Sequence, residues 1–429
     1  MRIIPPTIAD YNERALAAHT RRFDFLAAGL DAASVLLAAD SDPGAAGLDA
    51  LLDRLMAFQV AIPSWALGAG GTRFGRFGQT GEPRNLEEKI EDVGLLHTLN
   101  RSSGAISLHI PWDIPKNASA IKSLAAQHGL RFDAMNSNTF QDPQYKYGSL
   151  QHVDKSVRKK AIEHNKEVIR YGQALGSKCL SVWLADGSNF PGQLNFREAF
   201  QNTLESLRDI YTNIPEDWKL LLEYKPFEPN FYSTTVADWG QSLLYISKLG
   251  PKAFTLVDLG HHLHGTNIEQ IVALLLMEGR LGGFHFNDSK YSDDDLTVGS
   301  IKPYQLFLIF CELVQGTDHT PDISLMIDAS HNVKDPLEDL LQSVEAIMIA
   351  YTQALLVDWN RLRLARESND VVAAQETLQD AFRRDVRPLV AEARYRAGGA
   401  LDPLAVYRGE SVRKGLTTER GSGGRATGL

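Results

Sequence analysis

Eight short apolar segments with β character are spread along the chain, each followed by a helical segment or by a connection long enough to hold a helix. This alternation restricts the fold most, because successive strand and helix units build parallel sheets. Eight such units predict an α/β fold, a (β/α)8 TIM barrel, with an open doubly wound sheet as the alternative. The expected strands are Val60 to Ile62, Ala105 to Trp112, Arg131 to Asn136, Cys179 to Leu184, Leu220 to Lys225, Phe254 to Asp258, Gly283 to Asn287 and Leu325 to Asp328.

Helical spacing of apolar residues fills the connections and both ends of the chain. We expect an N-terminal helical arm over residues 1–56, the catalytic barrel over 57–335 and a C-terminal helical extension over 336–411. The extension contains two long amphipathic helices, one expected through Leu337 to Tyr351 and one through Leu378 to Leu389, and the polar, Gly-rich residues 412–429 predict a disordered tail. The helices expected within the barrel are Asn117 to His128, Ser156 to Leu175, Phe196 to Asn213, Thr235 to Leu249, Asn267 to Glu278 and Ile301 to Val314.

The composition favours a globular enzyme that acts on a small molecule. Of 429 residues, 44% are hydrophobic and 23% are charged, which permits a large core. The net charge of −9 disfavours binding to a phosphate backbone, so no nucleic-acid partner is expected. Cys179 and Cys311 lie in separate apolar runs, and no apolar stretch reaches the roughly 20 residues of a membrane span. We therefore expect a soluble, cytoplasmic protein without a membrane partner.

Four of the predicted strands end at, or lead directly into, carboxylates and imidazoles. Such groups are seldom buried unless they are paired or bind a metal, and barrel chemistry gathers at the carboxyl ends of the strands. These donors suffice for two neighbouring divalent ions with a bridging carboxylate. The mixture of carboxylate and imidazole favours Mn²⁺, Co²⁺ or Zn²⁺ over Ca²⁺. The candidate metal ligands are Glu223, Asp258, His261, His285, Asp293, Asp295 and Asp328.

Each of these residues also has a simpler interpretation. The run of acids at 293–295 is typical of a solvated turn, and a single histidine such as His285 is usually an ordinary core residue. Strand alternation nevertheless places Glu223 and Lys225 on one face, inside a barrel. His262 and His264 are expected to be solvent-facing loop residues. The metal hypothesis depends on all the strand ends together.

A Gly-rich stretch over residues 68–78 follows the first strand. It lacks the Gly-Lys-Ser/Thr ending of a triphosphate loop and the spacing of a dinucleotide fingerprint. Its glycines, with Phe74 and Phe77 at the tips, favour a mobile lid or a contact with a neighbouring subunit. An ordinary surface loop is the alternative.

Seven stretches carry a family likeness: Ser107 to Asp113, Asn136 to Asp142, Glu223 to Pro226, Val257 to His261, His285 to Ser289, Asp293 to Asp295 and Ser330 to Asn332. With these stretches the chain resembles the bacterial L-rhamnose isomerases, relatives of xylose isomerase, and most closely the broad-specificity branch known from Pseudomonas. Residues 315–323 depart from the family pattern, which leaves the preferred sugar open.

The resemblance implies a site with two metals in a homotetramer. One ion, structural, would be held by Glu223, Asp258, His285 and Asp328. The other, a catalytic Mn²⁺ or similar ion, would share Asp258 with His261, Asp293 and Asp295. Phe74 or Phe77 would reach into an adjacent subunit. The sugar would contact Lys225, His109, Trp112, Phe140, Trp183 and Ser330.

The function that follows is metal-dependent isomerisation of L-rhamnose to L-rhamnulose, with action on other aldoses such as L-mannose and D-allose. Lys225, Asp295 and His261 are the expected catalytic residues. Two routes stay open: a hydride shift, with Asp295 or a water on the metal carrying the hydroxyl proton, and a cis-enediol route.

Other functions on the same barrel are a metal-dependent hydrolase such as an abasic-site endonuclease, and another sugar isomerase or epimerase. An endonuclease needs a basic groove, which an acidic chain does not favour. A non-catalytic sugar-binding protein would not need seven ligand-type side chains at strand ends.

Overall fold

The computed structural model describes residues 4–30, 47–68, 71–72, 75–76, 78–228, 232–316, 322–329 and 333–422, with the backbone alone for 71–72 and 75–76. Phe74, Phe77 and Ser330 lie outside the described residues, so the lid, subunit-contact and sugar-binding roles given to them stay predictions.

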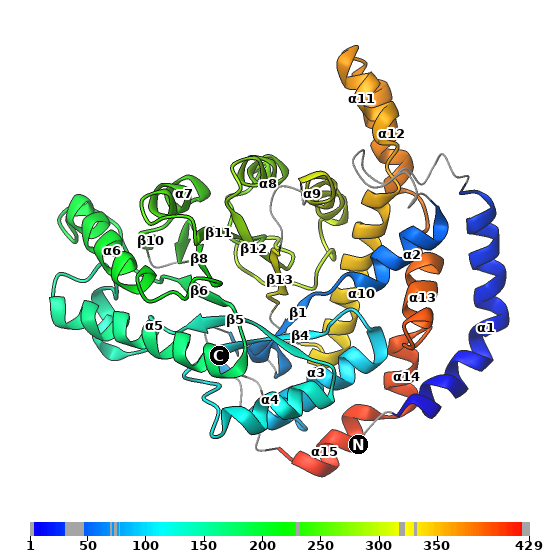
Figure 1. Cartoon of the computed structure of the whole chain (residues 1–429), viewed down its shortest axis with the longest axis horizontal. Helices are drawn as coiled ribbons and strands as arrows, with labels where there is room; N and C mark the ends of the chain where they lie inside the picture. The colour runs from blue at the N-terminus through cyan, green and yellow to red at the C-terminus, as the bar shows by residue number, and fades with distance from the viewer. Residues whose placement is uncertain are drawn as a thin grey trace.

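Eight parallel strands close into a barrel in the order β1-β13-β12-β11-β8-β6-β5-β4 (Figure 1). The predicted (β/α)8 barrel is therefore confirmed, and the open sheet is wrong. Each expected strand exists, with ends shifted by a few residues. The strands are β1 Ala61–Pro63, β4 Ala105–Ile110, β5 Arg131–Ser137, β6 Cys179–Trp183, β8 Lys219–Glu223, β11 Ala253–Asp258, β12 Leu281–Phe286 and β13 Ser324–Ile327.

One helix follows each barrel strand and packs outside it. All six expected helices are present. A further helix after β1 escaped prediction because its buried positions mix leucines with Glu88, Lys89 and Asp92, which hides the apolar stripe. The helices are α3 Leu86–Asn100, α4 Ala118–Gln127, α5 Lys155–Leu175, α6 Phe196–Tyr211, α7 Trp239–Ser247, α8 Ile268–Met277, α9 Pro303–Gly316 and α10 Pro336–Leu355.

Most of these helices begin at an Asn or Asp whose side chain accepts a hydrogen bond from a backbone N–H of the first turn. This satisfies one of the donors left free at a helix start and fixes where each loop ends. The capping residues are Asn85, Asn117, Asp154, Asn195, Asp238, Asn267 and Asp335.

Short elements decorate the barrel. A 3-10 helix, η2 Ser64–Leu67, follows β1, and η3 Pro143–Tyr147 follows β5. An antiparallel sheet is formed by β7 Gly187–Ser188, β10 Tyr232–Thr234 and β9 Phe227–Glu228, and β2 Gly71–Thr72 pairs with β3 Gly75–Arg76.

The two ends of the chain lie side by side along the barrel. Helix α1 (Pro5–Ala28) packs on α13 (Arg387–Arg396), which also contacts α2 (Leu48–Ala57). Helices α11 (Trp359–Glu367) and α12 (Val371–Phe382) form a hairpin that projects from the body (Figure 1). The limits proposed for the arm, barrel and extension remain predictions.

Two predictions for the C-terminal region are wrong. The second long helix, expected through Leu378 and Leu389, is interrupted, because α12 ends at Phe382 and Val386 is the N-cap of α13, with Pro388 in its first turn. Residues 412–422 are ordered rather than a disordered tail, and residues 423–429 lie outside the described residues. Helix α14 (Pro403–Gly409) leads into α15 (Val412–Arg420), where Arg420 pairs with the buried Asp92 at 2.8 Å. The ion pair between Arg420 and Asp92 anchors α15 to the barrel, and nothing in the polar composition of this segment indicates that contact.

Within the described residues, no single helix has the length and hydropathy of a membrane span. Helices α10 and α11 meet that test only when taken together, across a bend of 62°.

The barrel interior is layered along its axis. An apolar layer contains Ala134, Cys179, Leu221 and Leu256, which pack on one another. One strand step further, toward the carboxyl ends, the interior positions of β8 and β11 are Glu223 and Asp258. The alternation that buries Leu221 therefore directs these acids to the mouth of the barrel.

Candidate metal and active site

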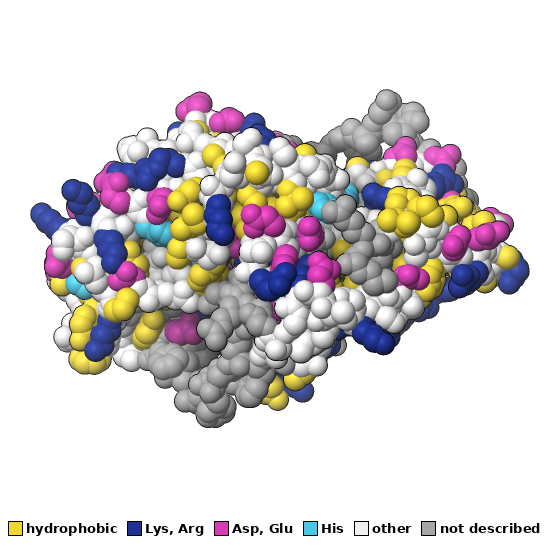
Figure 2. Space-filling model, turned by 90° about the horizontal axis from the view of Figure 1, so that it is seen from below, with side chains coloured by type: hydrophobic (Ala, Val, Ile, Leu, Met, Phe, Trp, Pro, Cys, Tyr) yellow, Lys and Arg dark blue, Asp and Glu magenta, His cyan; other side chains and the backbone are white. Residues whose placement is uncertain are grey.

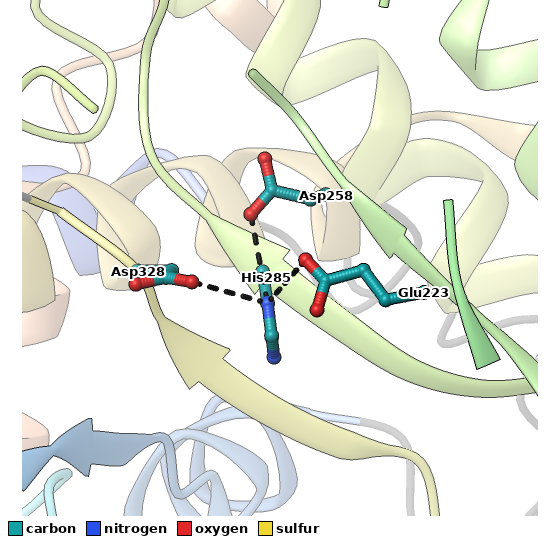
Figure 3. Close-up of side chains that lie close together, drawn as sticks. All are labelled: Glu223, Asp258, His285 and Asp328. Carbon is teal, nitrogen blue, oxygen red and sulfur yellow. Dashed lines mark ion pairs between the residues drawn. The ribbon is translucent and has the colours of Figure 1, made fainter. Parts of the chain in front are cut away.

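Four donors from four adjacent strands meet at the mouth of the barrel. Nδ1 of His285 lies 3.3 Å from Oε1 of Glu223, 3.5 Å from Oδ2 of Asp258 and 3.4 Å from Oδ2 of Asp328. Figure 3 shows the three carboxylates approaching the imidazole from different sides. One ligand atom from each residue lies within 4.8 Å of the others. The predicted structural-metal set is thus brought together.

This group fits a divalent cation. Nδ1 of His285 is buried and has no partner with hydrogen-bond geometry among the described residues, although three carboxylate oxygens face it. Three carboxylates confined around one imidazole repel one another unless a cation or proton lies between them. Oxygen donors with one imidazole nitrogen suit Mn²⁺ or Co²⁺.

Contacts behind the ligands fix their orientation. Oδ1 of Asp258 accepts hydrogen bonds from the backbone N–H of Gly260 at 2.7 Å and from Nδ2 of Asn287 at 2.9 Å. This leaves Oδ2 turned toward His285. On the other side, Nε1 of Trp65 donates to Oδ1 of Asp328 at 2.9 Å. Such outer contacts hold metal ligands in place before an ion binds.

The charges around His285 shift the pKa values of the group. Burial disfavours the imidazolium, but Glu223, Asp258 and Asp328 outweigh it and raise the pKa of His285. Burial likewise opposes the charge of Glu223, but His285 and the neighbouring His261 outweigh it and lower the pKa of Glu223 to about 2. A metal ion that binds Nδ1 of His285 would therefore compete with a proton.

His261 and Asp293 lie beside this group rather than within it. Nδ1 of His261 is 3.3 Å from Oε1 of Glu223, and its Nε2 is 2.9 Å from Oδ1 of Asp293. Glu223 thus faces both histidines. The structure brings these predicted ligands of the catalytic ion to the same cavity, in direct contact with one another.

The three consecutive acids at 293–295 have different surroundings. Oδ1 of Asp294 accepts a hydrogen bond from Ser289 and from backbone N–H groups of 290–292, so Asp294 stabilises the turn itself. Its neighbours Asp293 (φ 51°) and Asp295 (φ 42°) have left-handed backbone and line the cavity. Burial, followed by repulsion from Asp293, Asp328 and Asp258, raises the pKa of Asp295. The solvated-turn interpretation thus applies only to the middle acid.

Lys225 is held between acids at the same mouth. Its Nζ contacts Oδ2 of Asp293, lies 2.8 Å from Oε2 of Glu228 and sits 5.1 Å above the ring of Trp183. Burial opposes the ammonium charge, but the carboxylates of Asp293 and Glu228 raise the pKa of Lys225. The two carboxylates therefore favour the charged ammonium, whose N–H groups can donate hydrogen bonds.

Aromatic side chains form the opposite wall of a cavity of about 400 Å³. His109 stacks on Trp112 with ring centres 4.0 Å apart, and Phe140 meets Trp183 edge-on at 5.0 Å. Burial, aided by His164 and Lys89, lowers the pKa of His109 to about 3, so its ring is neutral. These four ring residues, which the resemblance assigns to sugar contact, all line this cavity.

Sequence reasoning missed several residues here. Trp65, Asn287 and Glu228 were not selected, although Trp65 follows the first strand and strand ends were the signal used. His262 was expected to face solvent. Instead it is half-buried, and its Nε2 lies 2.6 Å from the hydroxyl of the buried Tyr224. His264 is exposed, as expected.

A closed parallel barrel with carboxylates and imidazoles gathered at its mouth defines an α/β barrel of the kind that can hold a metal ion there. The chain belongs to the xylose isomerase-like TIM barrel family, whose model matches residues 103–322.

Two relatives match along most of their length. The "probable sugar isomerase R00627" of Rhizobium meliloti is 51% identical and covers 87% of this chain and 89% of the relative. The "probable sugar isomerase mlr5709" of Mesorhizobium japonicum is 50% identical, and the match covers 88% of this chain and 90% of the relative. A solved L-ribulose 3-epimerase, 15% identical, shares the fold with a TM-score of 0.52 over 74% of this chain and 99% of its own.

Proposed function

We propose that this protein is a metal-dependent aldose–ketose isomerase that interconverts L-rhamnose and L-rhamnulose and also accepts L-mannose and D-allose. The observation that carries the proposal is the meeting of His285 with three carboxylates beside Lys225, in a cavity of about 400 Å³ whose other wall is aromatic. The sugar isomerase names of the two relatives and the resemblance to L-rhamnose isomerases support it.

Glu223, Asp258, His285 and Asp328 would hold one divalent ion, and Asp258, His261, Asp293 and Asp295 a second, catalytic one. Mn²⁺ fits both sets best, with Co²⁺ or Zn²⁺ as substitutes. Such ions supply Lewis-acid polarisation of adjacent sugar oxygens. His261 and Asp293 of the second set contact each other, and His261 also contacts Glu223 of the first set, so these two donors lie next to the first ion site.

The chain's own groups complete the reaction. Lys225 donates a hydrogen bond to the sugar oxygen at C1 or C2, where negative charge develops. Asp295, which lines the cavity, would take up the proton of the sugar hydroxyl and return it as hydrogen moves between C2 and C1. The rings of Trp112, Phe140 and Trp183 cover the C–H face of the sugar and exclude water.

The remaining roles come from the resemblance. Ser330 would contact the sugar, and Phe74 or Phe77 would complete the pocket of an adjacent subunit in a homotetramer. A cytoplasmic location fits the two cysteines, which are free and buried.

The test is to incubate chelator-treated protein with L-rhamnose, L-mannose, D-allose and D-ribose, with and without Mn²⁺, and to identify the products. We expect ketoses that require Mn²⁺, fastest from L-rhamnose. A 3-epimer of a supplied ketose, with no aldose–ketose conversion, would assign the site to an epimerase instead.

The charge distribution weighs against an endonuclease. On the face shown in Figure 2, acidic and basic side chains are interspersed rather than gathered by sign. A groove for the phosphate backbone concentrates lysines and arginines on one surface. Cleavage of DNA containing abasic sites by the Mn²⁺-loaded protein would overturn this argument.

A further inference from the structure

A buried ion pair lies behind the aromatic wall. Nζ of Lys89 on α3 is 2.6 Å from Oδ1 of Asp113 in the loop after β4, and the two side chains are 1% and 0% exposed. Neither residue lines the cavity.

The second oxygen of Asp113 binds two segments that do line the cavity. Oδ2 accepts hydrogen bonds from Oγ of Ser64 at 2.5 Å and from the backbone N–H of His109 at 2.8 Å. The backbone N–H of Asp113 in turn donates to the carbonyl of His109 at 2.9 Å. Asp113 therefore joins η2 after β1 to the loop after β4.

Both segments carry residues of the site. Ser64 precedes Trp65, whose Nε1 braces Asp328, and Trp65 meets the His109 ring edge-on at 5.5 Å. His109 also stacks on Trp112. A displacement of Asp113 would thus move the brace of a metal ligand and the aromatic wall together.

Stability alone does not account for the pair. Taking two charges out of water costs more than most buried ion pairs return, and apolar residues of similar volume often replace them without loss. What apolar residues cannot supply is a fixed acceptor for Ser64 and for the N–H of His109. The networks that retain buried charge are those that specify one geometry.

We infer that Asp113, with its charge balanced by Lys89, is a positioning residue that holds Trp65 and His109 in register at the cavity. Its effect on turnover rests on the proposed isomerase function, whereas its effect on the tryptophans does not. It contacts neither the sugar nor the metal ligands.

Two double variants separate positioning from stability. Lys89→Met with Asp113→Asn removes both charges but keeps an acceptor oxygen. Lys89→Met with Asp113→Ala removes the charges and the acceptor. The six tryptophans permit ¹⁹F NMR of 5-fluorotryptophan protein, with the Trp65 and Trp112 signals assigned by Trp65→Phe and Trp112→Phe. Trp218 and Trp359, outside the cavity lining, are internal controls.

In metal-free protein, we expect the Asn variant to keep the parent positions of the Trp65 and Trp112 signals. The Ala variant should shift or broaden both signals and leave those of Trp218 and Trp359 in place. With Mn²⁺ and L-rhamnose, the Ala variant should lose kcat/KM by about 100-fold, as expected for a displaced site, while the Asn variant stays within the parent's order of magnitude.

Unmoved Trp65 and Trp112 signals in the Ala variant, with only a lower Tm, would overturn the inference. Equal losses of kcat/KM in the two variants would also overturn it, because the loss would then follow from the removed charges rather than from the removed acceptor. If the parent isomerised no sugar, the proposed function would fail, yet the NMR comparison would still decide the role of Asp113.

Discussion

The two halves of the barrel mouth are built from equivalent strand ends but carry opposite chemistry. Strands β8, β11, β12 and β13 contribute the carboxylates and the imidazole of His285. Strands β4 and β6, with the loops after β4 and β5, contribute the neutral His109, Trp112, Phe140 and Trp183. One barrel thus separates an acidic side, to which we assign cation binding, from an aromatic side, to which we assign contact with the sugar.

The difference shows what each half requires from its surroundings. Mutually repelling acids need outer donors such as Asn287 and Trp65 to hold them in place without an ion. The rings of the other half carry little charge and pack on one another, and the outer contact we infer for them is made by Asp113 to the backbone N–H of His109. Substitutions in the acidic half should therefore abolish metal binding, whereas those in the aromatic half should alter sugar affinity.

The largest effect is expected from Glu223→Gln. The change removes charge from a carboxylate that contacts both His261 and His285, and we expect Mn²⁺ binding to be lost and turnover to fall on the order of 1000-fold. Isothermal titration with Mn²⁺ and a ketose assay measure the two effects. Trp183→Phe in the aromatic half is the control and should bind Mn²⁺ like the parent; normal binding by Glu223→Gln would break the comparison.

Lys225→Met comes next. It should leave Mn²⁺ bound but lower kcat by about 100-fold, because the donor to the developing oxyanion is lost. Steady-state kinetics together with metal analysis separate the two properties. Lys219→Met, on the same strand but at its other end, should turn over normally. Normal turnover by Lys225→Met would show that its assigned role is wrong.

Asn287→Ala tests the outer support of the acidic half. Without the amide, Oδ1 of Asp258 keeps only the N–H of Gly260, and Mn²⁺ affinity should weaken roughly 10- to 100-fold. Titration with Mn²⁺ gives the value. An unchanged affinity would mean that Asp258 is held by the backbone alone.

The acidic half should also respond to pH. Because the raised pKa of His285 keeps it protonated near neutral pH, Mn²⁺ must displace that proton, and affinity should rise about tenfold per pH unit until the pKa is passed. Calorimetric titrations in buffers of different ionisation enthalpy count the released protons. Binding of Mn²⁺ without release of a proton would contradict the prediction that His285 is protonated in the metal-free protein.

The smallest effect is expected in the aromatic half. Trp183→Ala should raise KM for L-rhamnose about fivefold through loss of ring contact and leave Mn²⁺ affinity unchanged. Trp359→Ala on the projecting hairpin is the control. A loss of Mn²⁺ binding by Trp183→Ala would show that the two halves are not separable.

The same contrast explains what the sequence could predict. Strand and helix alternation gave all eight barrel strands, and charged residues at strand ends pointed to the acidic half because charge is rare there. Aromatic residues after a strand resemble ordinary core, so His109, Trp112, Phe140 and Trp183 emerged only through family resemblance. The roles of Trp65 and of the Lys89–Asp113 pair arise from contacts between segments that are distant in the chain. No local sequence pattern predicts such contacts.

The most direct test of the account is anomalous diffraction at the manganese edge from crystals grown with Mn²⁺. We predict a peak enclosed by Glu223, Asp258, His285 and Asp328. A protein that converts L-rhamnose in Mn²⁺ but shows no peak among these four residues would contradict it.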